Sequence, residues 1–240
     1  MTQQTAFDTN LVGLTDTGYR KWVHKIIAND RKTRPTDPFA ADYNRELRRW
    51  ERFVQCVLGM ACPEAISNRV LAFRYRTRRG TTRKSFREID FVSGNCGSPL
   101  LFSEIKIREK SEKARSGWPQ LRKTLAIART RWPAARGICV NVAIGDLIDT
   151  ECHCSFPTTR IQELSHAINT LSKSDGANIW IQGRDLVAFG VGNGVLRHGD
   201  VEQLVERRAM MLHPARILEQ RATAENPSGT GLFDAFLNDR

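Results

Sequence analysis

Three charged residues near the middle of the chain have the types and spacing expected for metal-assisted hydrolysis. Asp90 lies in a β-branched and aromatic stretch, and Glu104 and Lys106 lie two residues apart in the next such stretch. Side chains alternate between faces along a strand, so Glu104 and Lys106 point the same way. If the two strands are neighbours, Asp90 and Glu104 meet on one face, where two close carboxylates repel each other unless a cation binds them.

A divalent cation and a lysine would together provide the chemistry of phosphodiester cleavage. Mg²⁺ prefers carboxylate oxygens and retained waters, and Mn²⁺ is expected to substitute for it. Lys106 would orient a metal-bound water and favour its deprotonation. The alternative is that Glu104 and Lys106 are only an exposed ion pair on a solvated strand. The elements around them favour the first interpretation.

Those elements predict an α/β arrangement. A helix over about 40–59 has apolar residues at three- and four-residue steps. Three strands in an antiparallel meander are expected at 70–78, 84–92 and 100–107. A helix from Pro119 to about Trp132 follows, and then an almost wholly apolar strand at 136–144, which we expect to be central in its sheet.

Two short sequences in these strands carry a family resemblance. The chain reads EIDF at 88–91 and SEIK at 103–106, which resemble the two halves of the PD-(D/E)XK nuclease signature, with Ile89 in place of its proline. The resemblance covers about residues 40–145. It implies a restriction-endonuclease-like αβββαβ core with a mixed central sheet flanked by helices.

The same resemblance implies roles for the residues of the site. Asp90, Glu104 and the main-chain carbonyl of Ile105 would bind the metal, and Lys106 would be catalytic. Gln120 is similar to a glutamine that some branches carry on the next helix, where it would hydrogen-bond near the site or contact the DNA end. The alternative for Gln120 is an ordinary first-turn helix residue.

Many members of that family also place a metal-site glutamate on the helix before the strands. Glu51, within WERFV, matches that helix, and Glu46 is the competitor. The two positions differ by about 140° around an α-helix, so both are not expected to face the metal. A glutamate that is merely solvated on the helix is the alternative for Glu51.

Positive charge is concentrated in the same part of the chain. Residues 1–144 contain 28 Lys and Arg against 13 Asp and Glu, whereas residues 145–240 contain 9 against 13. Such asymmetry is typical of a polyanion-binding part beside an accessory part. Trp118 would either stack on an unpaired base or anchor packing. The residues expected to contact a phosphate backbone without base readout are Arg74, Arg76, Arg78, Arg83, Lys84, Arg108, Lys110, Lys113 and Arg115.

The predicted organisation has four parts. A polar start, a helix at 17–29 capped by Asp16 and a linker occupy 1–38, and the nuclease core occupies 39–145. An extension of the same domain occupies 146–222, with a helix at 158–173, a hairpin pairing 178–181 with 186–189, and a helix at 200–222. A flexible tail occupies 223–240, and its apolar stretch 231–237 would dock on a protein partner or pack on its own domain.

The sequence therefore predicts a Mg²⁺-dependent DNA endonuclease in restriction, phage defence, transposition or repair. The alternatives are an RNA-processing nuclease and a non-catalytic nucleic-acid-binding or scaffold protein that keeps the nuclease fold. No apolar run reaches the roughly 18 residues of a membrane span, and no signal peptide is recognisable. We expect a cytoplasmic protein without a membrane partner, and a homodimer is compatible with the sequence.

Overall fold

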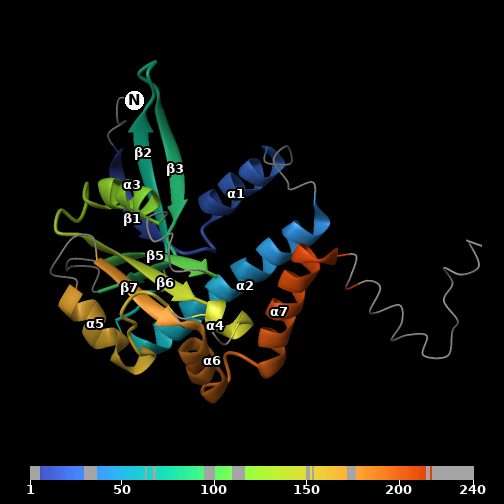
Figure 1. Ribbon diagram of the computed structural model, residues 1–240. Coiled ribbons are helices and arrows are strands. Elements are labelled where there is room, and N and C mark those ends of the chain that lie inside the picture. Colours follow the sequence, from blue (N-terminus) through green and yellow to red (C-terminus); the bar gives the residue numbers. More distant parts are fainter. Residues whose placement is uncertain are drawn as a thin grey trace, which may run out of the picture.

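Two β-sheets and the helices packed on them make up the part of the chain that the structure describes, as Figure 1 shows. The computed structural model describes residues 6–29, 37–62, 64–66, 69–94, 101–109, 117–149, 152, 154–171, 177–214 and 217. The α/β class expected from the sequence is confirmed.

The first sheet is antiparallel and has the order β1-β2-β3, with bounds Ala6–Val12, Val70–Arg76 and Thr82–Glu88. Strands β2 and β3 project from the rest of the molecule as a long hairpin (Figure 1). Strand β1 lies where the sequence predicted only a polar start, so that prediction is wrong. Its ladder to β2 is interrupted by a bulge at Asp8 (φ 51°), and this irregular pattern gives no clear alternation to detect in the sequence.

The second sheet is mixed and has the order β4-β5-β6-β7, with bounds Phe91–Ser93, Leu101–Arg108, Arg136–Ala143 and Ala177–Gln182. Strand β4 pairs antiparallel with β5, whereas β5, β6 and β7 run parallel to one another. The prediction that 136–144 is a central strand is confirmed, because β6 pairs on both sides and is buried along almost all its length.

The predicted strand at 84–92 is in fact two strands in different sheets, so the antiparallel meander is wrong in detail. Strand β3 ends at Glu88 and β4 begins at Phe91, with Ile89 and Asp90 between them. Arg69 holds this bend: its carbonyl accepts from the Ile89 N–H at 2.8 Å, and its guanidinium donates to the Asp90 carbonyl at 2.9 Å. Residues 91–93 are buried on both faces of the strand. The exposed hairpin could not bury both faces, so these residues pair in the second sheet instead.

Two helices precede the catalytic candidates. Helix α1 (Thr17–Asn29) begins as predicted at Asp16, whose carboxylate accepts from the Tyr19 N–H at 2.8 Å. Helix α2 (Pro38–Ala61) confirms the predicted helix at 40–59 and buries the apolar stripe that includes Trp50, Val54 and Leu58.

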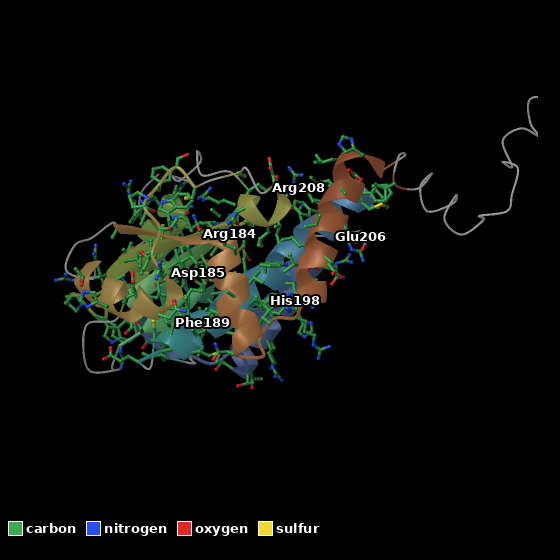
Figure 2. The ribbon with its side chains drawn as sticks, turned by 60° about the horizontal axis from the view of Figure 1, so that its bottom comes forward. Arg184, Asp185, Phe189, His198, Glu206 and Arg208 are labelled. Atoms are coloured by element: carbon green, nitrogen blue, oxygen red, sulfur yellow. The ribbon has the colours of Figure 1, made fainter. Side chains whose placement is uncertain are left out.

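The later helices are α3 (Trp118–Ala128), α4 (Gly145–Ile148), α5 (Leu164–Leu171, after a 3-10 turn at Ile161–Glu163), α6 (Gly183–Gly192) and α7 (His198–Leu212). Along the described parts of the chain, every helix is too short or too polar to cross a bilayer. Helix α7 packs on α2, and its Arg208 (Figure 2) donates to the Glu109 carboxylate at 2.9 Å, just beyond β5.

The predicted hairpin at 178–181 and 186–189 is wrong in its second half. The first segment is β7, but the second lies within α6, which begins directly after Gln182 (Figure 2). The buried positions Gly183, Leu186 and Gly190 recur at helical spacing. Gly190 lies so close to Leu196 that a β-carbon there would be 2.6 Å from the leucine side chain. Packing thus overrides the strand propensity of the local residues.

The four-stranded sheet has two unlike faces. One face, here called the apolar face, packs against α2, α5, α6 and α7 and carries Ile105, Ile138, Val140, Val142, Ile179 and Ile181. On the opposite face Phe102 and Cys139 pack under Leu121 and Leu125 of α3. The rest of that opposite face, here called the polar face, carries Glu104, Lys106, Arg108, Asn141 and Asn178.

Candidate functional site

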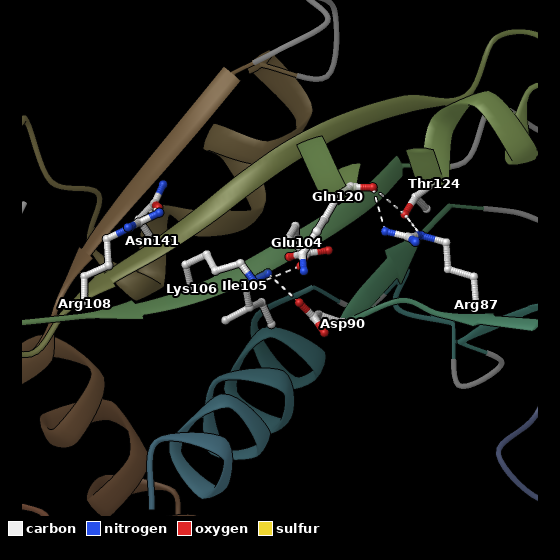
Figure 3. Close-up of polar contacts among 9 residues, drawn as sticks. All are labelled: Arg87, Asp90, Glu104, Ile105, Lys106, Arg108, Gln120, Thr124 and Asn141. Atoms are coloured by element: carbon white, nitrogen blue, oxygen red, sulfur yellow. Dashed lines mark hydrogen bonds and ion pairs between the residues drawn. The ribbon is translucent and has the colours of Figure 1, made fainter. Parts of the chain in front are cut away.

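Asp90 reaches strand β5 from the bend between the two sheets. Its carboxylate Oδ2 accepts from the main-chain N–H of Ile105 at 2.8 Å (Figure 3). Because Ile105 lies between Glu104 and Lys106, this bond brings the Asp90 carboxylate to the predicted pair. The register of β4 on β5, with Phe91 opposite Ser103, places Asp90 just before β4 and level with Glu104.

Glu104 and Lys106 lie on the same face of β5, as strand alternation predicts. The Lys106 Nζ donates to Glu104 Oε1 at 2.8 Å (Figure 3). The exposed fractions of these side chains are only 13% for Glu104 and 23% for Lys106. The pair is therefore not the solvated surface ion pair that the sequence left open as the alternative.

Glu51 is the carboxylate of α2 whose pKa is affected by the charges of this site. Burial raises the pKa of the Glu51 carboxyl, the charges of Asp90 and Glu104 raise it further, and Lys106 lowers it. Glu46 instead turns toward Arg49, which also pairs with Asp200 of α7. The two glutamates thus have separate surroundings, as their helical spacing predicts.

Carboxylates in this cluster oppose one another's ionisation. Burial raises the pKa of Asp90, against the Ile105 N–H and the cations Lys106, Arg69 and Arg87. Burial also raises the pKa of Glu104, and the charge of Asp90 adds to that effect. Glu88, at the end of β3, has its pKa raised by burial and by Asp90 as well.

This donor set is chemically suited to a hard divalent cation. Carboxylate oxygens are the ligands that Mg²⁺ prefers, and a cation would relieve the repulsion among Glu51, Asp90 and Glu104. In the described part of the chain, however, no three Asp, Glu, His or Cys side chains stand in a formed metal-binding group. Protein donors hold the carboxylates instead, Ile105 N–H on Asp90 and Lys106 on Glu104.

Arg87 connects the site to the start of α3, and no local pattern in the sequence indicates this contact. Its Nε donates to the Thr124 hydroxyl at 2.7 Å, and its Nη2 donates to the main-chain carbonyl of Gln120 at 2.8 Å. Arg87 also lowers the pKa of Asp90 and Glu104. The exposed Gln120 side chain points toward Glu104 in Figure 3, at the mouth of the site.

Gly117 and Cys139 form a close-packed wall beside the ion pair. A β-carbon on Gly117 would lie 3.0 Å from Cys139 Sγ and 3.6 Å from the Cγ atoms of Glu104 and Lys106. Burial and the charge of Glu104 together raise the pKa of the Cys139 thiol to about 12, so the thiol stays protonated at neutral pH and is not a nucleophile. Spacing alone could not have indicated either residue, because both reach the site through neighbouring elements.

The basic residues of the β2–β3 hairpin divide between its two faces. Arg74 and Lys84 are paired across the strands on the face that packs on α1, and Asp8 lies 3.4 Å from Arg74. Arg76 shares that face, but Arg78 lies in the turn after β2 has ended, so the predicted strand face through 78 is wrong. Arg83 is on the opposite face, which it shares with Arg87.

The other residues predicted to contact nucleic acid or a partner protein lie partly inside and partly outside the described residues. Arg108 lies on the polar face and donates to Asn141 Oδ1 at 2.9 Å (Figure 3). Trp118 is partly buried against Leu121 and its neighbours, which fits a packing anchor. Lys110, Lys113, Arg115 and the apolar stretch at 231–237 lie outside the described residues.

No family model, no curated protein and no solved structure matches the chain.

Proposed function

We propose that this chain is a Mg²⁺-dependent nuclease of the PD-(D/E)XK type that hydrolyses the DNA backbone. The observation that carries the proposal is that Asp90 meets β5 at Ile105, between Glu104 and Lys106, which bond to each other. The Glu51 carboxyl of α2 is near enough for the charges of Asp90 and Glu104 to raise its pKa. A buried group of like charges is costly in a protein with no use for it. A site that binds a cation and activates water has that use.

The order of elements supports the same proposal. Helix α2, strands β2, β3 with β4, and β5, then α3 and β6, follow one another as αβββαβ, with β3 and β4 as the two parts of the second strand. Strand β5 pairs antiparallel with β4 and parallel with β6, and a mixed sheet of this kind is what the proposed restriction-endonuclease-like core requires. The departure is that β2 and β3 belong to a separate sheet with β1.

In this mechanism each residue has a stated task. Glu51, Asp90, Glu104 and the Ile105 carbonyl would hold Mg²⁺, which when bound stabilises negative charge at the phosphate and lowers the pKa of a water. The Ile105 N–H keeps the Asp90 carboxylate oriented. Lys106 would orient the attacking water, and its bond to Glu104 keeps its ammonium group at the site before the substrate arrives. Arg83 and Arg87 lie on the hairpin face nearest α3, where they would contact phosphates.

The decisive experiment compares cleavage of plasmid, linear duplex, single-stranded DNA and RNA in Mg²⁺ and in EDTA. We expect cleavage only with Mg²⁺ and its loss in Asp90→Ala and Lys106→Ala, by about 10²–10⁴-fold for the lysine. Glu163→Gln is a matched control, since Glu163 is exposed and lies in the 3-10 turn before α5. Undiminished cleavage by both site variants would remove the assignment.

The same experiment separates the alternatives. Preference for RNA over every DNA substrate would identify an RNA-processing nuclease with the same site. Mg²⁺-independent binding of nucleic acid, with no cleavage by the unaltered protein, would identify a non-catalytic binder.

A further inference from the structure

A pair of stacked aromatic rings lies on the same side of the sheet as the proposed site. The rings of Phe156 and Trp180 are 4.7 Å apart between centroids and inclined by only 13°. Trp180 is 4% exposed, whereas Phe156 is 39% exposed. One ring therefore backs the other, and the outer ring presents apolar surface to solvent.

Strand register places this ring pair in line with the catalytic candidate. Lys106, Asn141 and Trp180 are register partners on the adjacent strands β5, β6 and β7. Neighbouring strands lie about 4.8 Å apart, so the backbone of Trp180 is about 10 Å from that of Lys106. The hydrogen bond from Asn141 Nδ2 to Asn178 Oδ1, at 3.3 Å, shows that β6 and β7 turn these residues to the same face.

Trp180 is buried, although it lies outside both hydrophobic cores that pack on the sheet. Its strand neighbours Ile179 and Ile181 belong to the large core on the apolar face, but Trp180 points the opposite way and belongs to neither core beside the sheet. Its cover comes from the segment that contains Phe156, which the Thr159 N–H fixes to the Trp180 carbonyl at 2.7 Å. A large ring has thus been placed under an exposed ring at the polar face.

Polar side chains lie between the proposed site and the Phe156–Trp180 ring pair, and others lie on the far side of the ring pair. The fully buried Asn141 lies between Lys106 and Trp180 in the register, and the Arg108 guanidinium, from two residues further along β5, donates to it. Past the ring pair, an open groove at the end of β7 is lined in part by Thr158, Arg160 and Gln182. A strand of nucleic acid on this side of the sheet would meet the partly exposed cations Lys106 and Arg108 before the apolar platform, and the hydrogen-bonding groups of the groove beyond it.

We infer that Phe156, supported by Trp180, stacks on one unpaired nucleobase next to the scissile phosphate. This inference rests on the proposed nuclease function and narrows its substrate to DNA that is single-stranded, frayed or flapped at the cleavage site. Every nucleobase offers a π-face, so such stacking adds affinity without selecting a sequence. A base within an intact duplex is already stacked on its neighbours and cannot use the platform.

The test measures binding with Ca²⁺ in place of Mg²⁺, using a single-stranded oligonucleotide that contains 2-aminopurine and a blunt duplex of the same sequence. Phe156→Leu keeps an apolar cover on Trp180 but removes the flat ring. We expect it to weaken single-strand binding on the order of tenfold and to reduce the stacking-induced quenching of 2-aminopurine, while duplex binding is unchanged. Phe156→Tyr should restore both signals.

The matched control is Phe7→Leu, because Phe7 is 37% exposed but lies on β1 in the other sheet. Unchanged single-strand affinity and quenching in Phe156→Leu, with an unaltered thermal unfolding midpoint, would overturn the platform even if the protein cleaves DNA. Equal losses for single strand and duplex would overturn it as well. Absence of cleavage by the unaltered protein would overturn the nuclease proposal alone, since the platform is read from binding.

Discussion

The two faces of the four-stranded sheet are built from alternate residues of the same strands, yet they have opposite characters. On β6, Ile138, Val140 and Val142 enter the large core, whereas Cys139 and Asn141 turn to the side of Glu104 and Lys106. The apolar face is covered by four helices, and the polar face is covered by α3 at one end. Residues that stabilise the fold and residues on the side of the candidate site are therefore next to each other along the strand and point to opposite faces.

This separation explains how the chain tolerates a costly cluster of charges. Burial of apolar side chains contributes roughly 25 cal/mol for each Å² removed from water, and the aliphatic side chains of β5, β6 and β7 provide that contribution on the apolar face. The polar face can then hold Glu104, beside Asp90 of the bend and Glu51 of α2, although burial and their mutual charges raise the pKa of these carboxyls. Changes on one face should mainly alter folding, and changes on the other should mainly alter catalysis.

The largest expected effect comes from neighbouring residues on opposite faces of β6. Ile138→Ala should lower the free energy of unfolding by about 2–5 kcal/mol, because it leaves a cavity in the large core. Cys139→Ala, equally buried, should cost only about 1 kcal/mol because it removes a single sulfur atom. Urea denaturation followed by circular dichroism measures both, and equal losses would show that the two faces contribute alike.

A smaller effect should distinguish the two glutamates of α2. Glu51→Gln should reduce cleavage at least about tenfold, equivalent to about 1.4 kcal/mol, and raise the Mg²⁺ concentration needed for half-maximal rate. Glu46→Gln should leave both kinetic quantities unchanged, because Glu46 turns to Arg49 instead. The reverse pattern would move the helix carboxylate of the site to Glu46.

Replacing Asp90 by Asn should stabilise the metal-free protein. Burial raises the pKa of the Asp90 carboxyl, so its contribution to stability is full below its ordinary pKa and is lost as pH rises through the folded-state value. At pH 7 the Asp90→Asn midpoint should exceed that of the unaltered protein by about 2–4 °C for each 1 kcal/mol gained. An amide oxygen can still accept from the Ile105 N–H.

With Mg²⁺ bound, the unaltered protein should have a higher unfolding midpoint than the Asp90→Asn protein. The cation should raise the unfolding midpoint of the unaltered protein more at pH 8 than at pH 5, because protons compete with it for the carboxylates. Differential scanning fluorimetry at both pH values is sufficient. If Mg²⁺ raised the unfolding midpoint of the Asp90→Asn protein as much as that of the unaltered protein, Asp90 would be excluded as a metal ligand.

The smallest effect concerns the wall beside the ion pair. Gly117→Ala places a β-carbon 3.0 Å from Cys139 Sγ, so the thiol or the loop must shift and cleavage should slow several-fold with little change in stability. The backbone of Gly117 has φ −73°, which alanine adopts without strain. Adding Cys139→Ala makes room and should restore the rate, and a double-mutant cycle measures the coupling. Additive losses would mean that the contact is unimportant.

The sequence alone determined the segments with strong local patterns. Helix α2 follows from its apolar repeat, and the cap of α1 at Asp16 follows from local chemistry. Alternation along β5 was enough to place Glu104 and Lys106 side by side, and helical spacing was enough to separate Glu51 from Glu46. These outcomes depend on residues a few positions apart, where backbone geometry fixes the relation between side chains.

Tertiary structure alone decided which strands share a sheet and how Asp90 meets β5. The bend after Glu88 depends on Arg69, β1 depends on its pairing with β2, and α6 depends on close packing at Gly190. Arg87, Gly117, Cys139 and the Phe156–Trp180 ring pair reach the polar face from distant parts of the chain. Contacts between remote segments leave no periodic trace in either segment, because their energy exists only once both are in place.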